Sequence, residues 1–407
     1  MATQEVDQVR VGFVGRIARS LRQGDIGSLP VLLGLVLIAI VFQIANPNFL
    51  TPLNLTNLMV QISALGTIAV GVVLVLLIGE IDLSVGAVSG LCAAIMAVLS
   101  AKNGLPASVA VPAGLVAGSL IGLLQGSWFA KLRVPSFVVT LAGYLGWQGV
   151  LLYVLGDTGT VNLTDPAITG IANTRLPLWL GWALGIVFVV GYAVVRWNER
   201  RRRGLAGVKR ESLSSLVVNV GVVAIGTLVA VAVMSVNRNP NSTIPIQGVP
   251  SAVVILLGFV VLFNYITERT AFGRHVFAVG GNVEAARRAG INVDRVRITV
   301  FVLTSTLAAA GGILAGSRLL AVNQSSGGGD LLLNSIAAAV IGGTSLFGGR
   351  GSTWAALLGA LVIGAIANGM DLLGLASSIK FIVTGVVLLL AITIDAVSRS
   401  RREVSGR

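Results

Sequence analysis

The chain has 407 residues, of which 55% are hydrophobic and only 11% are charged, whereas a soluble domain carries about 25% charged residues. Together with a mean hydropathy of +0.91, this composition excludes an ordinary soluble protein and indicates an α-helical membrane protein. The formal net charge of +13 indicates a positively charged cytoplasmic face rather than a surface that binds nucleic acid.

Apolar runs of membrane-spanning length recur along the chain and predict an all-α fold, a polytopic transmembrane helix bundle of about 12 spans with 10 as the lower bound. We assign residues 29–396 to a single transmembrane domain. The tenth and eleventh predicted spans are the least secure as full crossings. The glycine-rich stretch "IGGTSLFGGRGST" between them can instead dip into the membrane. The predicted spans are 29–46, 57–78, 82–101, 106–130, 135–155, 176–195, 213–235, 250–266, 298–317, 331–348, 353–373 and 378–396.

The basic residues predict which side each loop occupies. If the N-terminus is cytoplasmic and every span crosses, the cytoplasmic side holds all the basic residues except Lys102, Arg175, Arg238, Arg318 and Lys380. Such an imbalance is the positive-inside pattern of membrane proteins. We therefore expect both termini in the cytoplasm, with segment 1–28 before the first span and a tail at 397–407.

The stretch "GEIDLSVG" places two carboxylates between long apolar runs. Gly79 is suited to end one helix, and Asp82 to cap the next, with Ser84 in its first turn and Gly86 after it. Glu80 has no such role, since a carboxylate just beyond a helix C-terminus is mildly unfavourable. We expect a turn at the cytoplasmic mouth, in which Glu80 pairs with a basic residue or lines the inner gate. A substrate or ion site within the membrane is the alternative.

Two cytoplasmic segments have distinct compositions. Segment 196–212 contains four consecutive arginines, a pattern typical of an anchor near anionic lipid headgroups. Segment 267–297 is the longest cytoplasmic loop and contains the signals of a short helix. Asn282 is a good N-cap, and Gly290 is placed to stop the helix.

The residues between these two signals fit a two-turn helix. Glu284 falls in its first turn and Arg287 toward its last turn, where the helix dipole favours each charge, and Ala285 and Ala286 lie between them. A helix this short is not stable alone. It is either an interfacial helix on the membrane surface or a docking element for a cytoplasmic partner.

Catalytic patterns are absent from the sequence. There is no G-x-x-x-x-G-K-[ST] motif, no metal-ligand spacing, and the single histidine, His275, cannot complete a Ser-His-Asp triad. The single cysteine, Cys92, lies in an apolar run. We therefore expect no catalytic residue, no metal site and no cofactor in this chain. Few charges fall inside the spans, which argues against an ion-driven carrier.

Four blocks carry a resemblance to a known family. The blocks occur in the order "GEIDLSVG" (79–86), "VPSFVVTLAG" (134–143), "TAFGRHVFAVGGNVEAARRAGINV" (270–293) and "IAAAVIGGTSLFGGRGS" (336–352). Together they resemble the permease subunits of bacterial ATP-binding-cassette importers for monosaccharides, the ribose and xylose group. Glu80 in place of a more usual glycine, and an extra portion near 196–249, are similar to the xylose branch.

The resemblance implies a pore for a monosaccharide, with xylose expected, in a multi-pass protein of the bacterial inner membrane. It implies a second permease chain, a cytoplasmic ATPase with two nucleotide-binding domains that binds ATP and Mg, and an extracytoplasmic sugar-binding protein. Residues 282–290 would then be the coupling helix, with Glu284 and Arg287 as its charged contacts. Two other hypotheses remain, a secondary sugar transporter that acts alone and a membrane-anchored interaction protein without a transport role.

Overall fold

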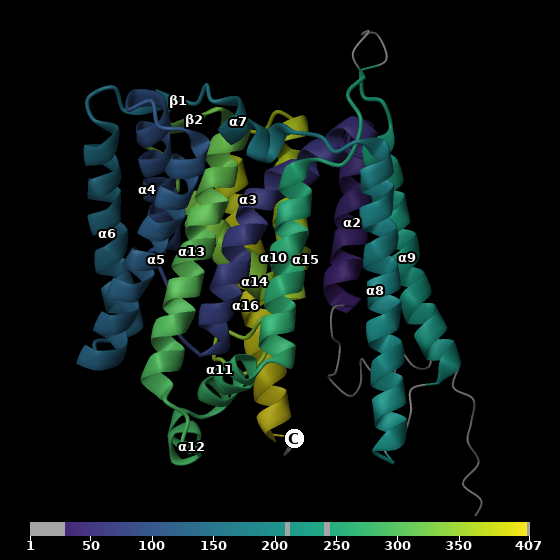
Figure 1. Ribbon diagram of the computed structural model, residues 1–407. Coiled ribbons are helices and arrows are strands. Elements are labelled where there is room, and N and C mark those ends of the chain that lie inside the picture. The colour runs from purple at the N-terminus through teal and green to yellow at the C-terminus, as the bar shows by residue number, and fades with distance from the viewer. Residues whose placement is uncertain (1–28, 208–211, 240–244, 405–407) are drawn as a thin grey trace, which may run out of the picture.

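The computed structural model describes residues 29–207, 212–239 and 245–404. They form a bundle of helices with one small two-stranded sheet (Figure 1). The predicted N-terminal segment 1–28, part of the basic segment at 208–211 and the end of the tail at 405–407 lie outside the described residues.

The first part of the bundle comprises α2 (Leu29–Ala45), α3 (Pro52–Leu77), α4 (Val85–Ala97), the π-helical turn η1 (Val98–Lys102), α5 (Ala107–Leu132), α6 (Ser136–Leu155), β1 (Thr160–Asn162), α7 (Pro166–Asn173), α8 (Leu178–Leu205) and α9 (Leu213–Ser235). The second part comprises α10 (Ser251–Arg269), α11 (Ala271–Gly281), α12 (Val283–Arg288), α13 (Val293–Leu319), β2 (Ala321–Asn323), α14 (Gly329–Ile341), α15 (Thr353–Leu372) and α16 (Ser377–Val404). Every predicted span falls on one of these helices.

Within the described residues, nine helices are long and apolar enough to cross a membrane, and three shorter apolar helices accompany them. The short helix α14 has 13 residues, about 20 Å at 1.5 Å per residue, and a hydrocarbon core is about 30 Å thick. Helix α14 is therefore shorter than the full crossing predicted at 331–348, as the alternative of a segment that dips into the membrane allows. Just after the helix, the backbone of Gly342 packs on that of Ala355, where a Cβ would overlap.

Two helices extend beyond the predicted spans. Helix α8 continues through the four arginines to Leu205, so the described part of segment 196–212 is mostly helix rather than loop. Helix α16 continues to Val404, so most of the predicted tail is helical as well. Arginine and glutamate are good helix formers, and apolar periodicity alone misses such polar extensions of a helix.

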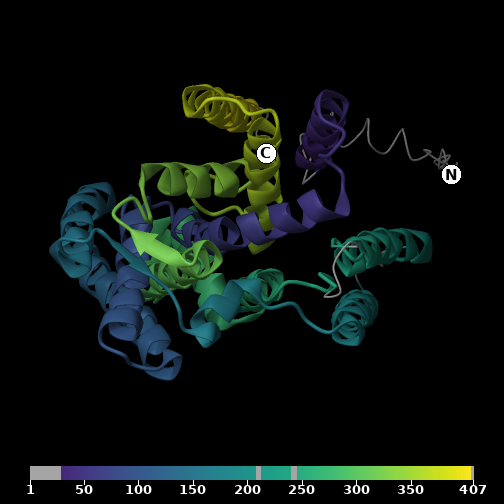
Figure 2. The same ribbon diagram turned by 90° about the horizontal axis from the view of Figure 1, so that it is seen from above.

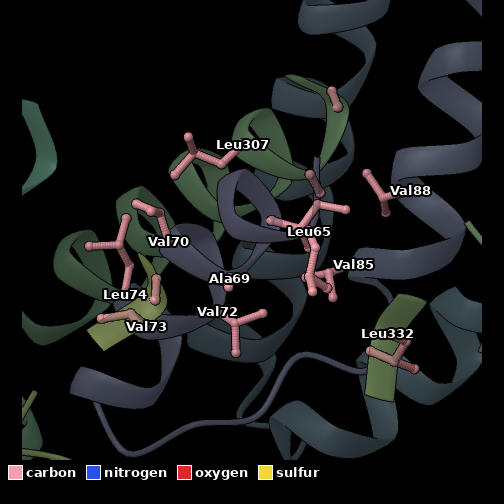
Figure 3. Close-up of a cluster of buried hydrophobic side chains, with 14 of the residues drawn as sticks. Leu65, Ala69, Val70, Val72, Val73, Leu74, Val85, Val88, Leu307 and Leu332 are labelled. Atoms are coloured by element: carbon pink, nitrogen blue, oxygen red, sulfur yellow. The ribbon is translucent and has the colours of Figure 1, made fainter. Parts of the chain in front are cut away.

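Helix α3 is the central helix of the bundle. In its most apolar stretch 89% of the residues are buried, against 11% in α8 and in α9, and the last two helices stand to one side in Figure 2. The core around α3 includes Leu65, Val73, Val88 of α4, Leu307 of α13 and Leu332 of α14 (Figure 3). Burial of these side chains joins four helices into one unit.

Helices α5 and α13 cross at a row of glycines on α5, spaced four residues apart on one face. A Cβ added to Gly122 would lie 2.5 Å from the carbonyl oxygen of Phe301 and 2.7 Å from the Cα of Val302. Small residues at four-residue spacing allow this close approach of two membrane helices. The crossing therefore depends on direct backbone contact.

The two ends of the bundle have different structures. At one end, which we call the ribbon end, β1 pairs antiparallel with β2, and Val161 faces Val322. At the other end, the α12 end, α11 and α12 lie across the helices (Figure 1). Among the described residues, α2 starts toward the α12 end and α16 finishes there, so both ends of the described chain lie on one side of the bundle.

Candidate functional site

The first candidate site lies between α3 and α4, at residues 78–84. Gly79, with φ of +76°, follows the last turn of α3, which confirms it as the predicted helix stop. Helix α4 begins at Val85, with Ser84 at its N-cap position. Asp82 lies two residues earlier and accepts a hydrogen bond from the Ser84 N–H at 2.8 Å. The prediction that Asp82 caps α4 is therefore wrong, and Asp82 instead forms an Asx turn before the helix.

Glu80 bridges three separate parts of the chain. Its Oε1 lies 3.1 Å from Arg297 Nη2 on α13, and its Oε2 accepts a hydrogen bond of 2.7 Å from Ser136 Oγ on α6. Burial raises the pKa of Glu80 above its ordinary value, while the Ser136 hydrogen bond and the Arg297 charge oppose that rise. The expectation that Glu80 pairs with a basic residue is confirmed.

Asp82 belongs to a buried polar cluster with Ser84 and Gln125 of α5. Ser84 Oγ lies 2.6 Å from Asp82 Oδ1 and 3.0 Å from Gln125 Oε1. Within the described residues, Asp82 Oδ2 and Gln125 Nε2 are buried without a partner. An unsatisfied buried group costs free energy, which marks this cluster as a candidate functional element.

The start of α4 packs against a loop that comes from the ribbon end. A Cβ on Gly86 would lie 2.7 Å from the Gly327 carbonyl oxygen, and one on Gly90 would overlap the Ser326 carbonyl. The loop belongs to residues 324–328, between β2 and α14. Segment 78–84 therefore runs back into the bundle, deeper than the tight turn that the sequence predicted at the mouth.

A second junction of glycines joins α11 to the end of α3. The Gly349 N–H donates to the Leu77 carbonyl at 2.9 Å, and a Cβ on Gly280 would overlap that carbonyl and lie 2.7 Å from Gly349 N. A Cβ on Gly348 would lie 2.9 Å from Gly79 N and Cα. Close backbone contact thus joins α11 to the start of segment 78–84.

The predicted short helix is present as α12, and its local signals are confirmed. Asn282 accepts a hydrogen bond from the Ala285 N–H at 2.9 Å, and Gly290 adopts a φ of +82° just after the helix. Glu284 and Arg287 form an ion pair of 3.0 Å with each other, and both are more than half exposed.

Helix α12 is anchored on one side only. Ala286 is the buried residue of α12, and it belongs to the same apolar core as α3 and α13. The helix therefore presents its charged face away from the bundle.

A cavity of about 450 Å³ opens beside α12. Its charged wall consists of Arg133, Arg287, Arg297 and Asp294. The guanidinium of Arg297 also lies over the ring of Phe129, 4.6 Å from its centroid. We call this the basic cavity, and it places Arg297 between α12 and Glu80.

A second cavity of about 340 Å³ lies toward the ribbon end. Helices α3, α4, α13, α14 and α15 and the 323–328 stretch contribute its walls. Its polar side chains include Gln61, Arg318, Asp330 and Asn334. We call this the amide cavity.

Arg297, Ser136, Gln125 and the amide cavity were not predicted from the sequence. Ser136 could have been found, because it lies in one of the four blocks that resemble the family. The sequence offers no comparable signal for the others. No group of His, Cys, Asp or Glu in the described part of the chain could hold a metal ion.

The chain is similar in sequence to known membrane transport permeases. A family model described as "Branched-chain amino acid transport system / permease component" matches residues 54–392. The xylose transport system permease protein XylH of Escherichia coli K12 is 36% identical over 353 residues, 87% of each chain. The Haemophilus influenzae XylH is 35% identical over 92% of this chain and 98% of its own length.

Ribose permeases are also similar. The ribose import permease protein RbsC of Escherichia coli K12 is 34% identical over 89% of this chain and 91% of its own length. No solved structure gives a significant match. The match to the family model and these relatives extend over most of the chain, and the protein therefore belongs to this family of membrane transport permeases.

Proposed function

We propose that this chain is the membrane-spanning permease subunit of a bacterial ATP-binding-cassette importer that moves a monosaccharide, xylose in the first instance, into the cytoplasm. The relatives that carry the names xylose and ribose permease support the substrate class. The wide coverage of those relatives supports transfer of the role to the whole chain rather than to one segment.

The observation that carries the proposal is the construction of α12. This helix has a side-chain cap at its start, a left-handed glycine after its end and an exposed charged face. It follows α11, whose Gly280 packs on the Leu77 carbonyl and on Gly349 beside segment 78–84. A stiff, exposed helix joined to a buried loop suits a subunit driven from outside by a rigid-body movement.

The partners follow from the same proposal. A separate ATPase with two nucleotide-binding domains binds ATP and Mg and docks on α12, with Glu284 and Arg287 as its charged contacts. A second copy of this chain completes the pore, and a sugar-binding protein delivers substrate at the ribbon end. No nucleic acid takes part, and the chain itself carries no catalytic residue, metal or cofactor.

The proposal places the α12 end in the cytoplasm and the whole chain in the inner membrane. The arginines of α8 lie in a helical extension beyond its apolar part, and α12 and the start of α13 are basic as well. An excess of basic residues on one side is the pattern of cytoplasmic loops.

Reconstitution tests the proposal. This chain, a two-domain ATPase and a xylose-binding protein from the same genome are placed together in liposomes, and uptake of labelled xylose is measured with ATP. We expect uptake that needs all three components and is weaker for ribose and galactose. Uptake by this chain alone under a proton or sodium gradient would instead identify a secondary transporter and overturn the proposal.

A further inference from the structure

The amide cavity at the ribbon end contains polar groups that the fold does not use. Among the described residues, Gln61, Arg318, Asp330 and Asn334 line it, and none of the four forms a side-chain hydrogen bond or salt bridge with another residue, although the charge of Arg318 interacts with that of Asp371. They come from three different helices, α3, α13 and α14. None of the four is fully buried, so each can contact a molecule that enters the cavity, and their convergence on one space indicates a ligand site.

The other polar groups of the cavity are already occupied and act as its frame. Asn323 Oδ1 accepts hydrogen bonds from Ser325 N at 3.0 Å and from Ser325 Oγ at 2.8 Å, and Ser326 Oγ accepts from Asn323 N at 2.9 Å. Ser89 donates to the Gly86 carbonyl. These bonds hold the 323–326 turn in place and leave the four unpaired side chains to face the space.

The chemistry of the lining favours a neutral, many-hydroxyl ligand. Two amides supply both donors and acceptors, Arg318 donates and Asp330 accepts, and the one positive and one negative charge cancel. Ile62, Leu65, Leu331 and Ile363 form the apolar wall. A volume of about 340 Å³ lies in the range of small-ligand pockets.

The cavity also suits passage rather than tight retention. None of the described residues that line it is aromatic, so it lacks the broad flat surfaces that add binding energy in many ligand pockets. Asp330 and Ser325 are exposed, which connects the cavity to the surface at the ribbon end.

We propose that the amide cavity is a monosaccharide subsite of the transport route, formed within a single copy of the chain by Gln61, Arg318, Asp330 and Asn334. This inference rests on the proposed function and deepens it. Sugar delivered at the ribbon end loses bound water and forms hydrogen bonds with these side chains. The helix bundle then changes its conformation. Helix α13, which reaches from α12 to Arg318, connects the subsite with the driven end.

Thiol labelling tests the position of the subsite. The chain has one cysteine, Cys92, which is buried, so the parent protein gives a low background. In complete transporter reconstituted with the ribbon end outside, we expect Asn334→Cys to react with a membrane-impermeant thiosulfonate, and xylose to slow this reaction several-fold. Thr164→Cys, on an exposed loop at the same end, should react at the same rate with and without xylose. Equal rates with and without xylose at residue 334 would overturn the proposal.

Transport stoichiometry tests the role of the side chains. Gln61→Ala, Asn334→Ala and Asp330→Asn should each lower the amount of sugar moved per ATP hydrolysed several-fold, while the loaded binding protein still stimulates the ATPase. The matched control is Asn57→Ala, an exposed amide on α3 one turn away that does not line the cavity, which should match the parent.

The outcomes separate the two proposals. If the parent complex moves no sugar, the proposed function fails. If the parent complex moves sugar and the three cavity variants keep its stoichiometry, the proposed function stands and the subsite is wrong.

Discussion

Glu80 and Arg297 are 217 positions apart in the chain and form an ion pair of 3.1 Å at the junction of segment 78–84 and α13. Less than a fifth of either side chain is exposed, so the pair is only weakly screened by solvent. Arg297 also lines the basic cavity beside α12. The pair therefore joins the start of α13 to the loop that precedes α4, beside the cavity that Arg287 of α12 also lines.

Glu80→Gln should weaken this connection. We expect sugar uptake by the reconstituted transporter to fall several-fold and the free energy of unfolding to fall by about 1–3 kcal/mol, less than for a fully buried pair because some exposure remains. Arg297→Gln should have a similar effect. The charge exchange Glu80→Arg with Arg297→Glu should recover part of the uptake. Full uptake by Glu80→Gln would make Glu80 a bystander.

Replacing Glu284 and Arg287 together by Ala should leave a folded, inserted protein. The pair is exposed and intrahelical, so its loss costs at most about 0.5 kcal/mol. We expect ATPase binding and ATP-driven uptake to be lost, measured by co-purification and by vesicle assay. The control exchanges the residues, Glu284→Arg with Arg287→Glu, which keeps the pair but reverses the presented charges. Normal uptake by the exchanged variant would show that the pair stabilises only the helix.

Gly122→Ala should damage the crossing of α5 and α13. The new Cβ meets backbone atoms of Phe301 and Val302, which cannot move aside as a side chain can, and overpacking costs about 1–3 kcal/mol. Thermal unfolding in detergent should occur at a lower temperature. Gly146→Ala on α6 is the control, because nothing lies within 4 Å of its added Cβ. Equal unfolding temperatures for the two variants would contradict direct contact at this crossing.

Local signals predicted the helices and α12 well, because they depend on neighbours in sequence. Apolar runs locate the spans, and Asn282 and Gly290 mark the ends of α12 without help from distant residues. The errors concern places where distant segments meet. Asp82 fits a helix start by its residue type, but α4 begins at Val85, where glycines let its first turns pack against the loop after β2.

The partner of Glu80 could not be chosen from sequence for the same reason. Segment 267–297 contains six basic residues, and only the packing of α13 against α5 and α3 selects Arg297. The amide cavity is a similar case, because Gln61 and Asn334 are 273 positions apart and lie on different helices. Only the fold shows that they share one space.

The length of α13 has a mechanical consequence. Its 27 residues span about 40 Å, and the glycine crossing with α5 lies in its middle part, near Phe301 and Ala309. Close contacts continue beyond that crossing, because a Cβ on Gly311 would lie 2.4 Å from Ile68 Cγ1 and one on Gly312 would overlap the Ser89 carbonyl. Helix α13 is thus held along much of its length and would move as a rigid rod. A displacement at Arg297 would then reach Arg318 at the amide cavity.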